Sequence, residues 1–408
     1  MKILILGAGV TGLSAGKLLQ SKAEVTILEQ DAEIGGIAKT RTVDGATYHT
    51  VGGHCFNSKY PEVLDFVFSL LPKDTWHLAQ RLSMINMGDY EISYPIEYAV
   101  KEIYQQDPEL AYEIAIDFMT AKDANNPANL EEWFRGKFGD ALCDRYFIPY
   151  NAKIWGREPR NMDYKWVQDK LPLPNKRGFF KSLMDSNRDT MPHSSFYYPN
   201  TNNQRSLIEA LADGQNIICN TPVRTIKKER GRWIVNGTFE ADRIISTLPL
   251  DLLPSYIESA PSIILEQAAL LRYNRVSNVF WKSQLTPKTW TYQPSSSTLF
   301  HRYIHIGSFF LPAAGYTITE CVGEHSFEDM VASGKKDSFL IRPLDYNVSE
   351  RAYVVFDENR EKAVQAILGW IDGEGLISIG RFGRWEYYNM DICIKQSMDT
   401  IKEMLKTI

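Results

Sequence analysis

The start of the chain carries the pattern that most restricts how it can fold. An apolar run over residues 2–6 precedes the pattern Gly7-x-Gly9-x-x-Gly12, and a helical pattern follows over 13–19. A second β-type run over 24–28 then ends at Glu29. A strand, a glycine-rich turn, a helix and a second strand that ends in an acid are typical of a Rossmann βαβ unit that binds a dinucleotide.

The residues of this motif have separate physical roles. Gly7 permits the tight turn, Gly9 lets the backbone approach a pyrophosphate, and Gly12 lets the helix pack closely on the strand. Amide groups at the helix N-terminus bind phosphate oxygens, and Glu29 can accept hydrogen bonds from both ribose hydroxyls. We therefore favour a bound dinucleotide over a glycine-rich turn without a ligand. The predicted cofactor contacts in this region are Gly7, Gly9, Thr11, Gly12, Glu29 and Gln30.

Bulk properties exclude several functional classes. The 408 residues predict two or three structural units, and a net charge of −5 argues against a general nucleic-acid-binding protein. The five cysteines lie far apart without a CxxC pair, which argues against a metal site and a disulfide framework and favours the reducing cytoplasm. The chain shows no signal-peptide pattern at its start, and no apolar run approaches the roughly 20 residues of a membrane span.

Later segments alternate between helical and strand patterns. Helical periodicity dominates residues 95–190, and six apolar residues of 130–147 fall on one helical face, namely Leu130, Trp133, Phe134, Phe138, Leu142 and Tyr146. Residues 276–354 are rich in aromatic and β-branched residues, which predicts a second, mostly antiparallel sheet. The other predicted elements are helices over 103–119, 202–213, 361–371 and 391–405 and strands over 217–218, 223–226, 233–235, 243–246 and 376–380.

A second glycine pair, Gly35-Gly36, follows the acid of the first motif. This pair resembles FAD-binding proteins of the amine oxidase and protoporphyrinogen oxidase type, which place it beside the flavin and its phosphates. Val223 falls where these proteins have a strand residue whose backbone meets adenine, and Ile245-Ser246-Thr247-Leu248-Pro249 resembles the strand that returns to their FAD domain. The resemblance implies that the resident dinucleotide is FAD rather than NAD, with Gly36 and Val223 among its contacts.

Five further segments, in chain order, are similar to the UDP-galactopyranose mutase family within this group. They are Val51-Gly52-Gly53-His54-Cys55-Phe56, Pro149-Tyr150-Asn151-Ala152-Lys153-Ile154-Trp155-Gly156, Phe300-His301-Arg302, Ala352-Tyr353-Val354-Val355-Phe356-Asp357, and Gly380-Arg381-Phe382 to Glu386-Tyr387-Tyr388-Asn389-Met390. The resemblance implies an α/β fold, in which a Rossmann-type FAD-binding domain carries an inserted helical domain and a second antiparallel sheet. The expected boundaries are 1–94 plus 200–265 plus 365–408 for the FAD-binding domain, 95–199 for the helical substrate domain and 266–364 for the antiparallel sheet substrate domain.

The resemblance also implies an activity. It indicates a flavin-dependent isomerase of cell-surface polysaccharide biosynthesis, a sugar-nucleotide mutase that interconverts pyranose and furanose forms. In this family N5 of the reduced flavin attacks the anomeric carbon and the nucleoside diphosphate leaves. The implied partners are reduced FAD and a nucleotide sugar, with UDP as the expected nucleotide and NADH or NADPH as candidate external reductants. A homodimer is compatible with the resemblance.

A diphosphate leaving group requires cations and hydrogen-bond donors around it. The planar fork of Arg302 suits phosphate oxygens, and Tyr353 and Tyr387 can donate neutral hydrogen bonds to the same group. The resemblance places Trp155 near the sugar and Tyr150 near the uridine. It further places His54 near the flavin, Arg381 near the FAD pyrophosphate, and the helix that starts near Met390 with its positive end toward the O2 side of the flavin.

Several residues depart from the family pattern. Lys170 stands where the family has its second catalytic arginine, which keeps the charge but loses the fork. Asn202-Asn203-Gln204 replaces a glycine pair, Asn389 replaces an aspartate and Ile37 replaces an asparagine. We interpret these departures as signs of a relative that acts on a different nucleotide sugar. An FAD-dependent oxidoreductase of the amine oxidase or protoporphyrinogen oxidase type is the alternative, and an FAD-fold binding module without catalysis is a third hypothesis.

Overall fold

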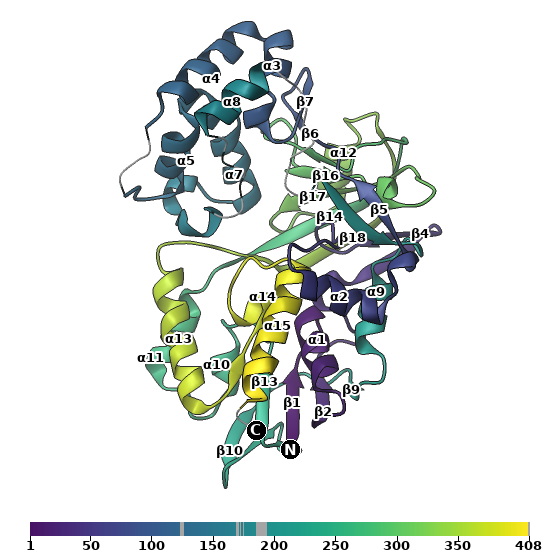
Figure 1. The fold of residues 1–408 in the computed structure, drawn as a ribbon, viewed down its shortest axis with the longest axis vertical. Helices are drawn as coiled ribbons and strands as arrows, with labels where there is room; N and C mark the ends of the chain where they lie inside the picture. The colour runs from purple at the N-terminus through teal and green to yellow at the C-terminus, as the bar shows by residue number, and fades with distance from the viewer. Residues whose placement is uncertain (123–125, 169–170, 172, 174, 185–193, 407–408) are drawn as a thin grey trace.

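The computed structural model describes residues 1–122, 126–168, 171, 173, 175–184 and 194–406 (Figure 1). Its lower part holds a five-stranded sheet in which all neighbouring strands are parallel. The strands, in spatial order, are β19 (Ile377–Ser378), β13 (Arg243–Ser246), β1 (Lys2–Leu6), β2 (Glu24–Leu28) and β9 (Ile217–Ile218). Helix α1 (Val10–Leu19) packs against the closing helix α15 (Met390–Met404). The predicted Rossmann unit is therefore confirmed.

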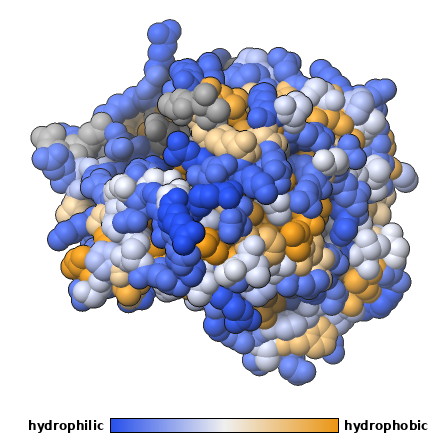
Figure 2. All heavy atoms as spheres, turned by 90° about the horizontal axis from the view of Figure 1, so that it is seen from below, coloured by the Kyte–Doolittle hydropathy of each residue, from blue (hydrophilic) through white to orange (hydrophobic). Residues whose placement is uncertain are grey.

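The parallel sheet is buried on both faces, as its uninterrupted apolar strands require. Ile3 and Ile5 of β1 contribute to the core on one face of the sheet, and Leu4 and Leu6 contribute to the core on the other. The helical insert and the second sheet share a separate, larger core. In Figure 2, which views the molecule from below, apolar side chains are interspersed with hydrophilic ones. No helix in the described part of the chain is long and apolar enough to cross a bilayer.

The insert at the top of Figure 1 is built from short helices rather than long ones. They are α3 (Val100–Gln106), α4 (Pro108–Thr120), α5 (Leu130–Phe138), α6 (Asp140–Leu142), a π-helical turn (Cys143–Phe147), α7 (Ile148–Trp155) and α8 (Lys176–Met184). The continuous helix predicted over 130–147 breaks at Gly139, which has a φ of 80°, although all six residues of its predicted apolar face are buried. The helix predicted over 103–119 breaks where Asp107 caps α4 by accepting a hydrogen bond from the Leu110 amide at 3.1 Å.

The second sheet has seven strands and is antiparallel except between β15 and β6. In spatial order they are β18 (Leu340–Val354), β14 (Tyr273–Ser283), β17 (Tyr316–Val322), β16 (Arg302–Ile304), β15 (Trp290–Tyr292), β6 (Ser83–Asn86) and β7 (Glu91–Ser93). The predicted antiparallel sheet is present. It also recruits β6 and β7 from the segment 1–94 that the sequence assigned to the FAD-binding domain, because Ile85 and Ile92 are fully buried against it.

The strand predicted over 223–226 begins only at Ile226, its last residue. Residues 223–225 form a loop instead, because the amides of Arg224 and Thr225 donate hydrogen bonds to the Asn236 side chain at 2.8 and 3.3 Å. The remaining strands are β3 (Thr40–Val43), β4 (Ala46–His49), β5 (Trp76–Gln80), β8 (Ser195–Pro199), β10 (Ile226–Glu229), β11 (Arg232–Val235) and β12 (Phe239–Ala241). The remaining α-helices are α2 (Pro61–Leu70), α9 (Arg205–Ala212), α10 (Leu253–Tyr256), α11 (Ser262–Leu270), α12 (Phe327–Gly334), α13 (Arg360–Glu374) and α14 (Gly380–Gly383).

We expect buried His305, which directly follows β16 of the second sheet, to make the stability of the fold sensitive to acid. Its ring nitrogens contact the hydroxyls of Thr291 at 2.9 Å and Thr317 at 3.1 Å. Burial, with a smaller effect of the Lys288 charge, lowers its pKa to about 3. Because the unfolded chain binds this proton more tightly, unfolding becomes easier as the pH falls from 6.5 toward 3. At pH 5 this proton lowers the free energy of unfolding by about 2 kcal/mol.

Urea unfolding of the wild type and of His305→Gln at pH 7 and pH 5 tests this linkage. The substitution removes the titrating ring and changes the stability at pH 7 as well. Between pH 7 and pH 5, however, the variant should lose about 2 kcal/mol less unfolding free energy than the wild type. Equal losses in the two proteins would contradict the assignment. Because each protein is compared with itself at the two pH values, the structural damage that the substitution causes cancels from the comparison.

Candidate functional site

A cavity of about 1600 Å³ lies between the Rossmann unit and the second sheet. Its walls come from the turn after β1, the segment from Leu28 to Val43, the loop from Thr50 to Cys55, strands β15 and β16, and the segment that leads into α15. Ligand pockets for one small molecule typically occupy about 300–1,000 Å³. The cavity therefore has room for a cofactor and a substrate together.

At one end of the cavity, the glycine motif leaves the backbone of the turn after β1 uncovered by side chains. Gly7 has a φ of 101°, and the backbones of Gly9 and Gly35 lie side by side. A Cβ atom added to Gly36 would lie 3.2 Å from the Cα of Gly9. Gly12 does not line the cavity; a Cβ there would lie 2.0 Å from the carbonyl oxygen of Gly7, so this glycine lets α1 approach the turn. The glycines thus take the positions that a bound pyrophosphate requires.

Glu29 stands at the end of β2 in the same part of the cavity. It is 6% exposed, and its two carboxylate oxygens accept hydrogen bonds from the amides of Ala8 at 2.7 Å and Asp31 at 3.0 Å. Each oxygen retains a further lone pair for a ligand hydroxyl. Gln30 and Val223 line the cavity nearby. These residues fit the adenosine half of a dinucleotide.

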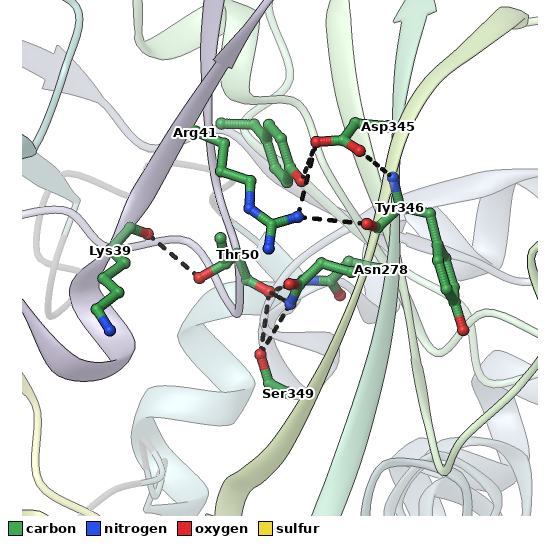
Figure 3. A network of polar contacts seen from close by, with 9 residues as sticks. Lys39, Arg41, Thr50, Asn278, Asp345, Tyr346 and Ser349 are labelled. Carbon is green, nitrogen blue, oxygen red and sulfur yellow. Dashed lines mark hydrogen bonds and ion pairs between the residues drawn. The ribbon is translucent and has the colours of Figure 1, made fainter. Parts of the chain in front are cut away.

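The loop from Thr50 to Cys55 is held against the second sheet by polar side chains, as Figure 3 shows. The carbonyl oxygen of Thr50 accepts hydrogen bonds from the side-chain amides of Asn278 at 2.7 Å and Asn347 at 2.9 Å. It also accepts one from the Ser349 hydroxyl at 3.3 Å. An added Cβ at Gly53 would lie 3.0 Å from Ile304 and 3.1 Å from the Trp290 ring, so only glycine lets the loop lie this close.

His54 follows these glycines and lines the cavity. Its backbone amide donates to Nδ1 of His49 at 2.7 Å, and Nε2 of His49 contacts the Tyr198 hydroxyl at 3.0 Å. The Nε2 atom of His54 is buried and has no hydrogen-bond partner in the described part of the protein. Burial and then the charge of Arg381 lower its pKa to about 4. The ring is neutral at pH 7 and offers an unused nitrogen to a bound group.

Arg302 on β16 lines the cavity and is paired with a buried acid. Its Nε donates to Glu320 on β17, and its Nη2 donates to the Tyr353 hydroxyl. Burial raises the pKa of Glu320, but the Arg302 guanidinium and the neighbouring His301 outweigh this effect and hold that pKa well below its ordinary value. The second carboxylate oxygen accepts from the Gly52 amide at 3.3 Å. Arg302 therefore belongs to an oriented ion pair, whose acidic partner was not predicted from the sequence.

One transverse row of the second sheet carries these contacts. Strand register places Tyr292 opposite Arg302, Arg302 opposite Glu320, Glu320 opposite Asn278, and Asn278 opposite Asn347. Residues directly opposite in neighbouring strands share one face of a sheet. The row thus runs beneath the loop from Thr50 to Cys55, which it fixes at both the Thr50 carbonyl and the Gly52 amide.

Two tyrosines and a second arginine complete this wall. The rings of Tyr353 and Tyr387 stack with centroids 5.8 Å apart, and the Arg381 guanidinium lies 5.3 and 4.6 Å from them. Arg381 donates to the carbonyl oxygens of Tyr388 at 3.0 Å and Ala352 at 3.1 Å, while its buried Nε has no partner among the described residues. All three side chains line the cavity, as does Met390 at the N-terminus of α15. The positive end of this long helix therefore meets the cavity.

Two predicted substrate residues lie one layer behind the cavity wall. Trp155 is 4% exposed and packs edge-on against Tyr353 and Tyr387, with ring centroids 6.1 and 6.2 Å away. Tyr150 packs edge-on against Tyr292 at 5.5 Å. Neither is among the residues that line the cavity. Their aromatic rings support the residues in front of them, and direct contact with substrate stays a prediction. Lys170 lies outside the described residues.

The structure adds residues that no sequence pattern identified. Arg81, Tyr94, Trp290 and Tyr292 form a further corner of the cavity. No motif marks them, because Arg81 and Tyr94 flank β6 and β7, which join the sheet only through the tertiary fold. Glu320 could have been suspected from the sequence, since it is a single acid inside the apolar and β-branched run of β17. Within the described residues, no group of three or more His, Cys, Asp or Glu side chains is arranged to hold a metal ion.

Comparison with known proteins supports the assignment of a dinucleotide-binding unit at the start of the chain. A family described as NAD(P)-binding Rossmann-like domain matches residues 5–70. Among curated proteins, the dTDP-fucopyranose mutase of Escherichia coli is 25% identical over 178 residues. That match covers 42% of this chain and 46% of the relative, so it spans less than half of either protein.

Solved structures match over the whole chain. A reduced UDP-galactopyranose mutase superposes with a TM-score of 0.87 at 20% identity, covering 100% of this chain and 96% of that one. A putative protoporphyrinogen oxidase from Exiguobacterium sp. 255-15 gives 0.78 at 17% identity, covering 99% and 98%. The resemblance expected from the sequence segments is thus confirmed, and the low identities fit a divergent relative. These superpositions establish the fold.

Proposed function

We propose that this chain, which has the fold of UDP-galactopyranose mutase, binds FAD and isomerises the sugar of a nucleotide sugar between its pyranose and furanose forms. The observation that carries the proposal is the Arg302 side chain. It is oriented by Glu320 and Tyr353 and lines the same cavity as the dinucleotide-binding turn. A cation fixed in this way suits a diphosphate leaving group better than the apolar substrate of an oxidase.

FAD fits the residues present. The glycine turn and the buried Glu29 carboxylate lie along one cavity with Nε2 of His54 and Nε of Arg381, two nitrogens that have no partner among the described residues. We assign Gly7, Gly9, Thr11, Glu29, Gln30, Gly36, Val223, Arg381 and Met390 as its contacts, with Gly12 packing beneath the turn. When bound in its reduced form, FAD supplies the nucleophile for the anomeric carbon. The protein contributes binding, orientation and charge.

The leaving diphosphate gains negative charge as its bond to the sugar breaks. The remaining N–H groups of Arg302 and the hydroxyls of Tyr353 and Tyr387 are the donors that we assign to its oxygens. Glu320 fixes the fork before the substrate arrives, so little reorganisation is needed during the reaction. The neutral His54 ring can hydrogen-bond the cofactor or the sugar without adding a second charge.

Two relatives of different specificity support the proposed substrate class. One acts on a UDP-linked galactose and the other on a dTDP-linked fucose, as their names state. We propose a nucleoside-diphosphate sugar, with UDP as the nucleotide. The departures at Ile37, Asn389 and residues 202–204 favour a sugar other than galactose. NADH or NADPH would supply the priming reduction.

Turnover of the reduced protein tests the proposal. The purified, FAD-loaded protein is reduced with dithionite under nitrogen and incubated with UDP-galactopyranose, and in parallel with dTDP-fucopyranose. Furanose is then measured by chromatography. We expect furanose only in reduced samples, with the oxidised protein as control. Oxygen consumption with peroxide release by the oxidised protein in air, without furanose in the reduced samples, would instead support the oxidase alternative.

A further inference from the structure

Arg81 lies in a corner of the cavity that the proposed function does not yet use. Its guanidinium lies 5.0 Å from the centroid of the Trp290 ring and 5.5 Å from that of Tyr94. Its Nε donates to the Ser83 hydroxyl at 2.9 Å, and its Nη2 donates to the Tyr292 hydroxyl at 2.8 Å. Arg81, Tyr94, Trp290 and Tyr292 all line the cavity. The side chain is therefore held in one orientation by rings and hydroxyls.

Among the described residues, no carboxylate pairs with Arg81 in this corner. Three other cations that line the cavity have acidic partners: Arg302 pairs with Glu320, Lys39 pairs with Asp31, and Arg351 pairs with Asp251 at 3.0 Å. Arg381, which we assign to FAD, donates to carbonyl oxygens instead. No carboxylate within the described residues forms an ion pair with Arg81, whose hydrogen-bond partners are neutral. Removing a guanidinium from water without an anion is costly. Cation–π contacts recover only part of that cost, so the corner suits an anion that the described residues do not supply.

The corner lies next to the rest of the site. Tyr292, which accepts the Arg81 hydrogen bond, stands directly opposite Arg302 in the strand register. Because its oxygen accepts from Arg81, its own proton is free to be donated to a ligand. The Trp290 ring also faces Gly53 in the loop that carries His54, since a Cβ atom added to Gly53 would lie 3.1 Å from it. A ligand held by Arg302 therefore extends toward Arg81 along one wall.

We propose that Arg81 is an oxyanion-binding residue that recognises a negatively charged oxygen of the nucleotide sugar, assisted by the Tyr292 hydroxyl. The inference rests on the proposed function, since it takes that ligand class as given. The oxygen belongs either to the diphosphate or to a carboxylate carried by the sugar. Both present the planar or forked oxygens that an arginine binds through two parallel hydrogen bonds. Arg81 and Arg302 then bind the ligand on the two sides of Tyr292.

Equilibrium binding to the oxidised holoenzyme tests the proposal without any turnover. UDP, UDP-galactose and UDP-galacturonate are titrated while flavin fluorescence is recorded, for the wild type and for Arg81→Gln. Loss of a charge-assisted contact is expected to weaken binding by about 10- to 100-fold. A loss for all three ligands identifies the diphosphate as the source of the oxygen. A loss for UDP-galacturonate alone identifies the sugar carboxylate.

Unchanged affinity of Arg81→Gln for all three ligands would overturn the proposal. Arg81→Lys keeps the charge without the fork, and we expect it to lose less affinity than Arg81→Gln. If the glutamine variant does not fold, Tyr292→Phe replaces it and should weaken the same ligands by about 3- to 10-fold. Arg342→Gln is the matched control, because Arg342 pairs with Asp44 at the surface, away from the cavity. Failure of the mutase assay would leave these binding results intact.

Discussion

Replacing Arg302 by lysine is expected to lower the kcat of the reduced, FAD-loaded protein by about 10²- to 10³-fold, as removal of one oriented donor does in enclosed sites. Lysine retains the positive charge but lacks the planar fork that orients separate N–H groups toward Glu320, Tyr353 and a phosphate oxygen. The buried Glu320 carboxylate is then left with a weaker partner. Steady-state furanose formation from the nucleotide sugar measures the loss.

Two controls separate catalysis from folding. Arg342→Lys alters an exposed arginine of the same sheet, which pairs with Asp44, and should leave kcat unchanged. Glu320→Gln keeps the shape of the acid but removes its charge, so Arg302 loses its orientation and kcat should fall while the flavin spectrum is retained. Arg302→Lys with wild-type kcat would show that the leaving group is bound elsewhere.

Substituting Gly12 by alanine is expected to abolish FAD binding. The new Cβ would lie 2.0 Å from the carbonyl oxygen of Gly7 and 3.2 Å from its carbonyl carbon, both of them backbone atoms that cannot rotate away. Relief requires α1 to move from the turn that holds the pyrophosphate. We expect a colourless protein with an unfolding free energy lowered by about 3 kcal/mol. Flavin absorbance and thermal unfolding measure the two effects.

Gly369→Ala provides the matched control. Gly369 lies within α13, is exposed, and has no atom within 4 Å of an added Cβ. Alanine there should stabilise the fold by about 0.5–1 kcal/mol, because it restricts the unfolded chain and favours the helix. A yellow Gly12→Ala protein with the melting temperature of the wild type would refute the role given to the close packing of α1.

The parts of the site that could be predicted are those encoded by neighbours in sequence. The turn from Gly7 to Gly12 depends on backbone freedom at fixed spacing, so its glycines and Glu29 could be identified from the amino-acid sequence alone. The same holds for the buried helical face of residues 130–147, although Gly139 divides that helix. The family resemblance then located Arg302, Tyr353 and Arg381, all of which line the cavity.

The parts that could not be predicted depend on strand register. Nothing near Arg302 in the sequence indicates that Glu320 lies opposite it, because that pairing is decided by how β16 and β17 align. Arg81 reaches the cavity only because β6 joins β15 in parallel, across about two hundred residues of chain. The family resemblance places Trp155 and Tyr150 near the ligand; in the structure neither lines the cavity, and their contact with substrate stays a prediction.

The transverse row from Tyr292 to Asn347 has a consequence for how such a protein diversifies. Each residue of the row comes from a different strand, and the backbone hydrogen bonds keep the spacing between strands whichever side chains the row carries. Replacing one residue of the row would change which ligands the cavity admits, while the residues that bind the loop from Thr50 to Cys55 stay in place. Under the proposed function, sequence drift among distant relatives would therefore change the sugar that is accepted without disturbing the chemistry performed on it.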